Sequence, residues 1–245
     1  MPGPCNTLAF RRGEARLARR TNTLDVPIFD LLPSLSEITE KDNIMSQLQS
    51  DDLFVGKLVR LSAPRPEDKD ALAAWSNDAE YLRLLEDDPT RPRSAEYYGD
   101  RDKERENQRE REHRIFEFRI RAIAEDKLIG FAALWVDWKN QTAGLGMGIG
   151  DADYRDRGYG TDALRLTVNY GFRELNLYKV TLGVFSYNPR ARHVYEKVGF
   201  VLEGTERAAI YRDGERHDLI MMGILRPEWE QMRARQEAQA APNHH

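Results

Sequence analysis

The sequence predicts a single domain of the α+β (mixed α/β) class. Two pairs of strand-like segments are each joined by a short turn sequence, which is typical of antiparallel hairpins. Between these pairs the order is strand, helix, strand, helix, which points to helices packed on a sheet. With 245 residues, 40% of them hydrophobic, the chain can bury one substantial core.

The chain divides into three parts by composition. Residues 1–52 have mixed composition and weak periodicity, and we interpret them as an N-terminal extension without an assigned activity. Residues 53–228 carry the regular patterns of the compact domain. Residues 229–245 are interpreted as a C-terminal tail.

The first half of the domain mixes helices with a first strand over 55–61. An apolar stripe behind an acidic first turn predicts a helix over 67–77, and leucines near 81–85 predict a second, short one. Residues 95–113 are almost wholly charged, which is typical of a helix with a solvated surface.

A hairpin is predicted over 116–136. Apolar residues from Phe116 to Ala124 alternate with residues such as Glu117 and Arg119, which indicates a strand with one buried face. The charged turn at 125–127 leads into an apolar strand that returns beside the first.

The second half continues with a glycine-laced strand over 143–150 and, after a turn, a helix to about 175. A strand over 178–185 precedes a helix for which Asn188 is the candidate N-cap and Gly199 the stop. The last two strands, 200–211 and 216–225, flank an Asp-Gly pair that is a strong hairpin signal.

The turn at residues 155–161 is a candidate anion site. Gly158 and Gly160 allow a ligand to approach the backbone, and the first N–H groups of the following helix lack intrahelical partners. These donors and the positive end of the helix dipole suit a phosphate, and Arg155 and Arg157 add positive charge. A diphosphate-bearing cofactor is the ligand we expect.

Composition argues against several other classes. The net charge of −4 gives no overall basic surface for nucleic acid, although five arginines cluster between Arg11 and Arg20. No apolar run approaches the roughly 18 residues of a membrane span, and we expect a cytoplasmic protein. The single cysteine, Cys5, fits a reducing compartment, and the five histidines lack the spacing of a metal site.

Two motifs give the chain a resemblance to the GNAT (Gcn5-related) N-acetyltransferases. Arg155-x-x-Gly158-x-Gly160 resembles the pyrophosphate loop of that family, and the segment from Asn188 to Phe200 resembles its Asn-x-x-Ala-x-x-x-Tyr-x-x-x-Gly-Phe motif. The resemblance covers roughly residues 54–226. Within the family, residues 170–179 look most like the branch of ribosomal-protein N-terminal and spermidine acetyltransferases.

The resemblance implies a single-domain acyl-CoA N-acyltransferase fold, with a central, mostly antiparallel sheet flanked by helices. It also implies an acetyl-CoA-dependent N-acetyltransferase that moves the acetyl group directly to a primary amine. A possible acceptor is a protein N-terminus, a polyamine or another small amine, or an aminoglycoside-like antibiotic. A non-catalytic acyl-CoA-binding regulatory module is the alternative.

The same resemblance implies site residues. By its position in the second motif, Tyr195 matches the tyrosine that acts as general acid in the family. A phenol suits this role, because with a pKa near 10 it is protonated at neutral pH and can supply a proton to a thiolate. Asp137 is the second residue that we predict to be catalytic, as a substitute for the general base of the family. The residues expected to bind the cofactor are Gly148, Ile149, Gly150, Arg155, Asp156, Arg157, Gly158, Tyr159, Gly160, Thr161, Asn188, Ala191 and Tyr195.

The general base is where the chain departs from the family pattern. Many relatives carry a glutamate on the strand before the pyrophosphate loop, but residues 144–147 contain no acid. Asp137 and Glu117 are the possible substitutes, although either can also be an ordinary solvated strand residue. Because an α-amine has a pKa near 8, it needs little help to lose its proton, and the departure favours α-amines or weakly basic amines over spermidine. Exposed strand edges make a homodimer plausible.

Overall fold

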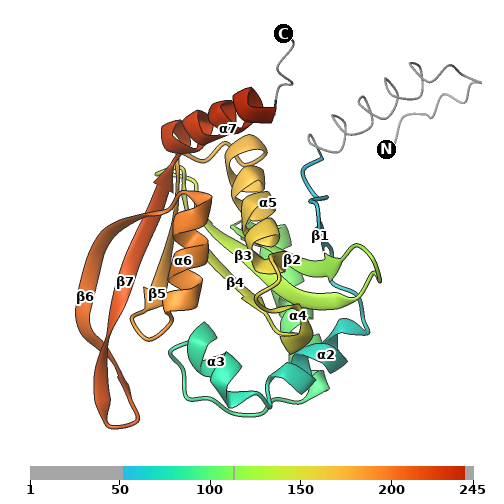
Figure 1. Cartoon of the computed structure of the whole chain (residues 1–245). Coiled ribbons are helices and arrows are strands. Elements are labelled where there is room, and N and C mark those ends of the chain that lie inside the picture. The colour runs from blue at the N-terminus through green and yellow to red at the C-terminus, as the bar shows by residue number, and fades with distance from the viewer. Residues whose placement is uncertain (1–51, 113, 241–245) are drawn as a thin grey trace, which may run out of the picture. The chain divides into compact units, whose positions relative to one another are not determined.

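The computed structural model describes residues 52–112 and 114–240. The predicted N-terminal extension, except Asp52, lies outside the described residues. Seven strands form one sheet in the order β1-β2-β3-β4-β5-β7-β6, and every neighbouring pair is antiparallel except β4 with β5 (Figure 1). The expected mixed α/β fold with a mostly antiparallel sheet is confirmed. In the described part of the chain, no helix is both long and apolar enough to cross a membrane.

The strands are β1 (Val59–Ser62), β2 (Ile115–Ala122), β3 (Leu128–Asp137), β4 (Thr142–Ile149), β5 (Lys179–Phe185), β6 (Val201–Arg212) and β7 (Glu215–Leu225). The helices are α2 (Asp68–Trp75), α3 (Ala79–Leu85), α4 (Ala95–Glu112), α5 (Tyr159–Arg173), α6 (Pro189–Val198) and α7 (Arg226–Ala240), with a short 3₁₀ turn at Ala152–Tyr154.

The local signals for turns and caps are borne out. Asp213 and Gly214 have φ of 53° and 82°, as a two-residue hairpin turn between β6 and β7 requires. The side chain of Asn188 accepts a hydrogen bond from the backbone N–H of Ala191 and so caps α6. Gly199 ends that helix in the left-handed conformation.

The parallel contact between β4 and β5 is short. Only Thr142, Ala143 and Gly144 pair with β5, and beyond Gly144 the two strands part. From there β4 pairs only with β3, and β5 only with β7. The middle of the sheet therefore opens toward the C-terminal end of β4.

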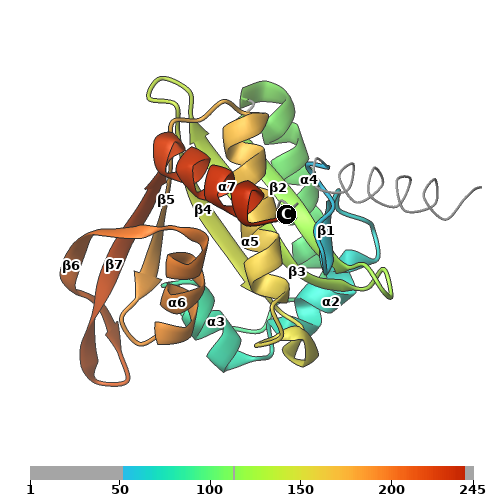
Figure 2. The ribbon, with the colours of Figure 1, turned by 45° about the horizontal axis from the view of Figure 1, so that its top comes forward.

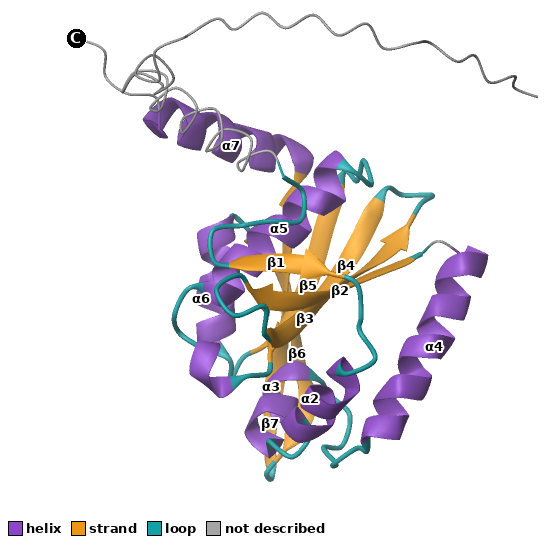
Figure 3. Ribbon diagram, turned by 90° about the vertical axis from the view of Figure 1, so that its right-hand side faces the viewer, coloured by secondary structure: helices purple, strands orange, loops and turns teal. Residues whose placement is uncertain are grey.

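Helices cover both faces of the sheet (Figure 3). Helix α5 packs on one face, where the rings of Tyr170 and Phe118 of β2 lie 4.9 Å apart. Helix α4 lies on the other side of the sheet. The apolar core thus forms mainly between the sheet and α5.

The prediction that β2 has a single buried face is wrong. Glu117, Arg119 and Arg121 point away from the apolar core, but their residues are only 5%, 0% and 3% exposed. Helices α2 and α4 cover them and supply counter-charges, so the solvated surface predicted for residues 95–113 is also wrong for the side of α4 that faces β2. The alternation along β2 shows which residues share a face of the strand. It does not show that helices distant in the sequence cover that face and supply counter-charges.

We call the side chains at this interface the charged cluster. A guanidinium nitrogen of Arg119 lies 2.6 Å from Asp102 of α4, and Arg119 also pairs with Glu117. Arg105 of α4 pairs with Glu117 as well. Asp68 of α2 lies 2.5 Å from a guanidinium nitrogen of Arg121 and 3.8 Å from Nε of Arg119. Ion pairs therefore connect α2 and α4 to the sheet.

Helix α7 begins at Arg226 and continues through most of the predicted tail, to Ala240. Trp229 is buried in the core, and its ring centroid lies 5.1 Å from that of Phe172 at the end of α5. Arg226 donates a hydrogen bond to the carbonyl of Phe172 at 2.5 Å. Figures 1 and 2 show α7 lying across this end of α5. The first part of the predicted tail therefore packs against the domain.

Replacing Arg119 should strongly destabilise the domain. Arg119→Met removes one positive charge and leaves the carboxylates of Glu117 and Asp102 short of a partner in a buried setting, which costs about 3–5 kcal/mol of unfolding free energy. Urea unfolding followed by circular dichroism measures this loss.

Arg192→Met is the matched control, because Arg192 forms an exposed pair with Glu196 one helical turn away. That change should cost less than about 1 kcal/mol. Similar losses in the two variants would contradict the importance of the charged cluster.

Candidate active site

A cavity of about 360 Å³ lies where β4 parts from β5. It is bounded by the end of β4, by the turn that leads into α5 and by α6. Many of the residues predicted to bind a cofactor meet in its lining: Gly148, Ile149, Arg155, Asp156, Gly158, Gly160, Thr161, Asn188, Ala191 and Tyr195. We call it the cofactor cavity.

The start of α5 offers free donors to this cavity. Gly158 precedes the helix with a φ of 89°, a left-handed conformation that favours glycine, and no side chain caps the helix there. The N–H of Asp162 donates to the carbonyl of Gly158, the residue before the helix, at 3.0 Å. The N–H groups before Asp162 therefore point out of the helix end, where an anion can bind.

Three residues predicted to bind the cofactor lie outside the lining of this cavity: Gly150, Arg157 and Tyr159. A Cβ atom on Gly150 would lie 2.1 Å from the ring of Trp75, so this glycine is needed for close packing. The Arg157 side chain donates to the carbonyl of Asp153, and the ring of Tyr159 packs edge-on against Tyr154.

Arg155 lines the cofactor cavity, but its guanidinium forms hydrogen bonds and an ion pair within the protein. It donates to the carbonyls of Ile149 at 3.0 Å and Gly150 at 2.7 Å, and it pairs with Asp78, the N-cap residue of α3, at 3.1 Å. The backbone N–H of Tyr81 and the Arg155 guanidinium hold the pKa of Asp78 below its usual range. Arg155 thus fixes the end of β4 to α3.

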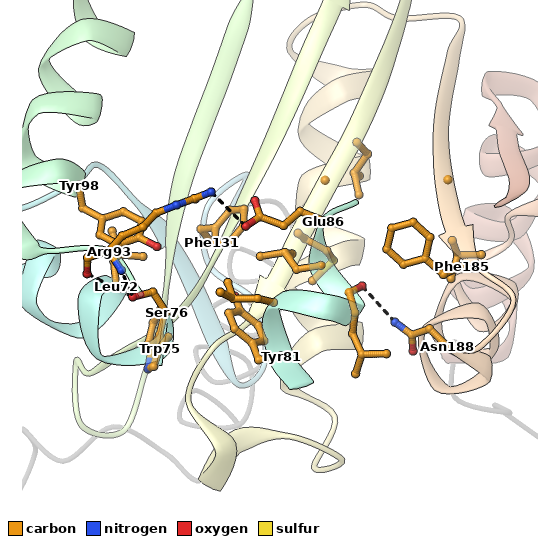
Figure 4. A pocket seen from close by; sticks show the side chains of 18 of the residues that line it. Leu72, Trp75, Ser76, Tyr81, Glu86, Arg93, Tyr98, Phe131, Phe185 and Asn188 are labelled. Atoms are coloured by element: carbon orange, nitrogen blue, oxygen red, sulfur yellow. Dashed lines mark hydrogen bonds and ion pairs between the residues drawn. The ribbon is translucent and has the colours of Figure 1, made fainter. Parts of the chain in front are cut away.

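A second cavity, also of about 360 Å³, lies between α2, α3, α4 and the strands β3, β4 and β5 (Figure 4). We call it the acceptor-side cavity. Its lining shares six residues with that of the cofactor cavity: Tyr81, Leu84, Leu85, Met147, Asn188 and Tyr195. The two cavities therefore meet at the gap between β4 and β5.

Tyr195 lies on α6 at this junction. It is partly buried against the core, with its ring centroid 6.0 Å from that of Phe200. Burial raises the pKa of Tyr195 to about 12, so the phenol is protonated at neutral pH. Asn188, which caps the same helix, also donates from its amide to the carbonyl of Leu84 at 3.4 Å and so ties α6 to α3.

The sequence analysis missed Tyr81, which lies at the same junction. Its side chain is buried, and its hydroxyl has no hydrogen-bond partner among the described residues. A Cβ atom on Gly148 would lie 2.6 Å from this hydroxyl, so the strand passes directly beside it. Burial raises the pKa of Tyr81, which keeps the hydroxyl a donor. Nothing in the sequence pattern distinguishes Tyr81 from an ordinary helix residue.

The structure does not bring Asp137 to this site. Asp137 pairs with Thr142 at the first residue of β4 and lines neither cavity, although Trp135, two residues before it, lines the acceptor-side cavity. Its carboxylate accepts hydrogen bonds from Asn140 and from the N–H of Lys139, and the amide of Asn140 in particular lowers its pKa. Asp137 thus stabilises the turn between β3 and β4.

Glu117, the other candidate base, is not available either. Its carboxylate is committed to Arg105 and Arg119 within the charged cluster. The carboxylate that does line the acceptor-side cavity is that of Glu86, which follows α3.

Comparison with known protein families identifies the fold. The profile described as the Acetyltransferase (GNAT) domain matches residues 59–201, which is more than half of the chain. The chain belongs to the GNAT acetyltransferase family. The resemblance drawn from the two sequence motifs is confirmed.

Individual relatives match the central part of this GNAT chain. The probable N-acetyltransferase YjcK of Bacillus subtilis is 35% identical over 118 residues, which cover 47% of this chain and 65% of YjcK. The putative ribosomal N-acetyltransferase YdaF of the same organism is 35% identical over 44% of this chain and 59% of its own length. The spermidine N(1)-acetyltransferase of Escherichia coli K12 is 36% identical over 31% and 41%. The chain thus matches less than two thirds of the length of each of these relatives.

Solved structures are similar to this chain over a larger share of its length than these relatives are. A crystal structure of a probable acetyltransferase superposes with a TM-score of 0.62 and 26% identity, covering 71% of this chain and 96% of the other. The Vibrio cholerae spermidine N-acetyltransferase in complex with CoA and spermine gives a TM-score of 0.61 at 23% identity, covering 71% and 98%. At 23% identity, the similarity to the Vibrio cholerae enzyme shows a shared fold.

Gly158 and Gly160 should respond differently to alanine. Gly158→Ala forces a left-handed conformation on an L side chain and should lower the unfolding free energy by about 1 kcal/mol. At Gly160 a Cβ atom would make only an ordinary contact, 3.5 Å from Ile149, so Gly160→Ala should leave stability unchanged within about 0.5 kcal/mol. Urea midpoints of the two variants check this, and equal losses would show that the conformation of Gly158 is not the cause.

Proposed function

We propose that the protein is an N-acetyltransferase that uses acetyl-CoA as cosubstrate and transfers the acetyl group directly to a primary amine. The observation that carries this proposal is the position of Tyr195, which lines two cavities that meet where β4 and β5 part. One cavity ends at the free donors of α5, and the other is separate enough to hold a second substrate. Direct transfer needs such a meeting point, because much of the rate comes from placing two reactants together.

The residues present fit acetyl-CoA. The uncapped start of α5 supplies backbone donors for its phosphate groups, and Gly158 keeps the approach to them open. The edge of β4 beyond Gly144 has no strand partner, so its backbone can pair with an extended ligand. The buried hydroxyl of Tyr81 lacks a partner among the described residues and can donate to a ligand that lies along Gly148. When bound, acetyl-CoA supplies an acetyl group activated as a thioester.

We assign the role of proton donor to Tyr195. Its raised pKa means that the phenol holds its proton over the whole physiological range. At the junction it can give that proton to a leaving thiolate, a step in which a positioned acid typically contributes a factor of about 10² to 10⁴ in rate. The cap and the Leu84 contact of Asn188 fix the start of the helix that carries Tyr195.

Glu86 is the carboxylate that we assign to the amine. It lines the acceptor-side cavity, and one of its oxygens, Oε1, is buried without a hydrogen bond although a guanidinium nitrogen of Arg93 lies 3.4 Å away. A partly satisfied carboxylate attracts an ammonium group and can accept its proton. This replaces Asp137 in the mechanism.

We propose a cytoplasmic enzyme, as the composition predicts, and a homodimer remains a prediction from the exposed strand edges. The names of the relatives include a ribosomal and several spermidine acetyltransferases, which supports an amine acceptor. No role in nucleic-acid binding is proposed.

Thiol release from acetyl-CoA, measured with a panel of primary amines, tests the function. The panel comprises peptides with free N-termini, spermidine, an aminoglycoside and small amino compounds. We expect amine-dependent release with at least one class. Tight binding of acetyl-CoA without release for any amine would show that the protein is a non-catalytic acyl-CoA-binding module.

Removing the phenol of Tyr195 should slow turnover without weakening cofactor binding. Tyr195→Phe should lower kcat at least about tenfold, because the proton donor is lost, while the Kd for CoA measured by calorimetry stays within about twofold. Since Tyr195 has a pKa of about 12, its ionisation should not reduce the activity of the wild type between pH 8 and 10.

Tyr211→Phe is the control, because Tyr211 lies on β6 with 65% of its surface exposed. It should behave as the wild type. An unchanged kcat in Tyr195→Phe would remove Tyr195 from the role of general acid.

A further inference from the structure

The wall of the acceptor-side cavity that lies away from Tyr195 is cationic. Arg93, Arg101 and Arg105 all contribute to the lining, whereas Glu86 is the one carboxylate that the lining contains among the described residues. Figure 4 shows Arg93 and Tyr98 on one side of the cavity, Asn188 and Phe185 on the other, and Glu86 between them. The chemistry expected near Asn188 and Tyr195 thus faces a wall of positive charge.

The three arginines differ in how their charges are balanced. Arg105 pairs with Glu117 of the charged cluster, and Arg93 lies 3.4 Å from Glu86. For Arg101, no described carboxylate lies within 4 Å of the guanidinium. Its neighbour on the helix, Asp102, is committed to Arg119 at 2.6 Å. Arg101 is therefore the one arginine of this wall whose charge no described side chain neutralises at contact distance.

Arg101 is also held in place and partly removed from water. Its guanidinium stacks over the ring of Tyr98 at 4.8 Å, and its Nε is buried without a hydrogen bond in the described part of the chain. Burial lowers the pKa of Arg101, and the positive charge of Arg119 acts in the same direction. An arginine nevertheless stays protonated at neutral pH, so a charged donor without a partner faces the cavity. Such a group costs free energy unless a ligand supplies an anion.

We propose that the acceptor is a primary amine that also carries a carboxylate, which binds at Arg101 while the amine points toward Glu86 and Tyr195. This inference rests on the proposed acetyl transfer and names its substrate class. A planar guanidinium held over an aromatic ring suits a carboxylate, because its parallel N–H groups match the two oxygens. Spermidine has no anionic group and would bring additional positive charge to this wall.

Two sources can present this chemistry. One is a free amino acid, and the other is a peptide N-terminus with an acidic side chain near it. Two matched pairs of acceptors separate them: β-alanine with β-alaninamide, and the peptide amides Ser-Glu-Ala and Ser-Gln-Ala. Within each pair only the carboxylate changes, so the ratio of kcat/KM reports the value of that charge.

In the wild type, the carboxylate member of one pair should have a kcat/KM at least about tenfold above its amide, as a charge-assisted hydrogen bond predicts. Arg101→Met keeps much of the side-chain length and removes the charge. It should raise KM for the carboxylate acceptor about tenfold, leave the amide acceptor within about twofold, and so abolish the preference. Arg101→Lys should retain part of it, because the charge remains but the fork is lost.

Lys103→Met is the matched control. Lys103 lies on the same helix, its side chain is 79% exposed, and it pairs with Asp100 at 3.4 Å. It removes one positive charge from α4 outside the cavity, and it should leave the preference unchanged. A loss of preference in this variant as well would assign the effect to the general field of the helix and would overturn the role of Arg101. Equal use of carboxylate and amide by the wild type would overturn it too.

A binding measurement keeps this inference separate from the proposed function. Calorimetry with N-acetyl-β-alanine and with the N-acetylated Ser-Glu-Ala amide, each in the presence of CoA, needs no turnover. Binding of one of them by the wild type, weakened about tenfold in Arg101→Met, supports the carboxylate site even if no amine releases thiol. If amines release thiol but neither compound binds, acetyl transfer stands and the carboxylate site is overturned.

Discussion

The parting of β4 from β5 is the constraint on which the site depends. Backbone N–H and C=O groups in a sheet need partners, and a strand that leaves its neighbour exposes an edge. Here β4 loses β5 after Gly144 and keeps β3 on its other side. The open edge therefore offers unpaired backbone groups at the place where the donors of α5 and the phenol of Tyr195 converge. An ordinary continuous sheet of the same strands would have neither cavity.

The charged cluster holds α2 and α4 on the sheet and also influences the charge of the acceptor-side cavity. An apolar interface between α4 and β2 would hold the helix as well, because buried ion pairs are seldom more stable than apolar contacts of similar volume. It would, however, remove Arg105, which both pairs with Glu117 and lines the acceptor-side cavity. With Asp102 and Arg105 facing the sheet, the same helix presents Arg101 to the cavity. The helix that holds the layer in place also sets the electrostatics of the cavity.

Structural features that depend on neighbours in the chain could be predicted from the sequence, and contacts between distant segments could not. The caps of α6, the β6–β7 turn and the loop at Gly158 follow from short sequence signals, because they depend on neighbours in the chain. Tyr81 and Arg101 reach the site only because α3 and α4 dock beside β4, which no local pattern encodes. The placement of Asp137 failed for a simpler reason. In an antiparallel hairpin the end of β3 pairs with the start of β4. Asp137 therefore lies beside the first residue of β4, at the opposite end of that strand from the loop that leads into α5.

Helix α3 connects the two cavities mechanically. With seven residues it is too short to be stable alone, so its position depends on tertiary contacts. Three of these come from different elements: Arg155 reaches Asp78 at its start, Asn188 reaches the carbonyl of Leu84, and Arg212 of β6 reaches the carbonyl of Glu86 at 3.2 Å. Because Arg155 also donates to the carbonyls of Ile149 and Gly150, one guanidinium joins the start of α3 to the end of β4. The same short helix carries Tyr81, which lines both cavities, and ends at Glu86, which lines the acceptor-side cavity, so contacts from three elements fix the position of both side chains.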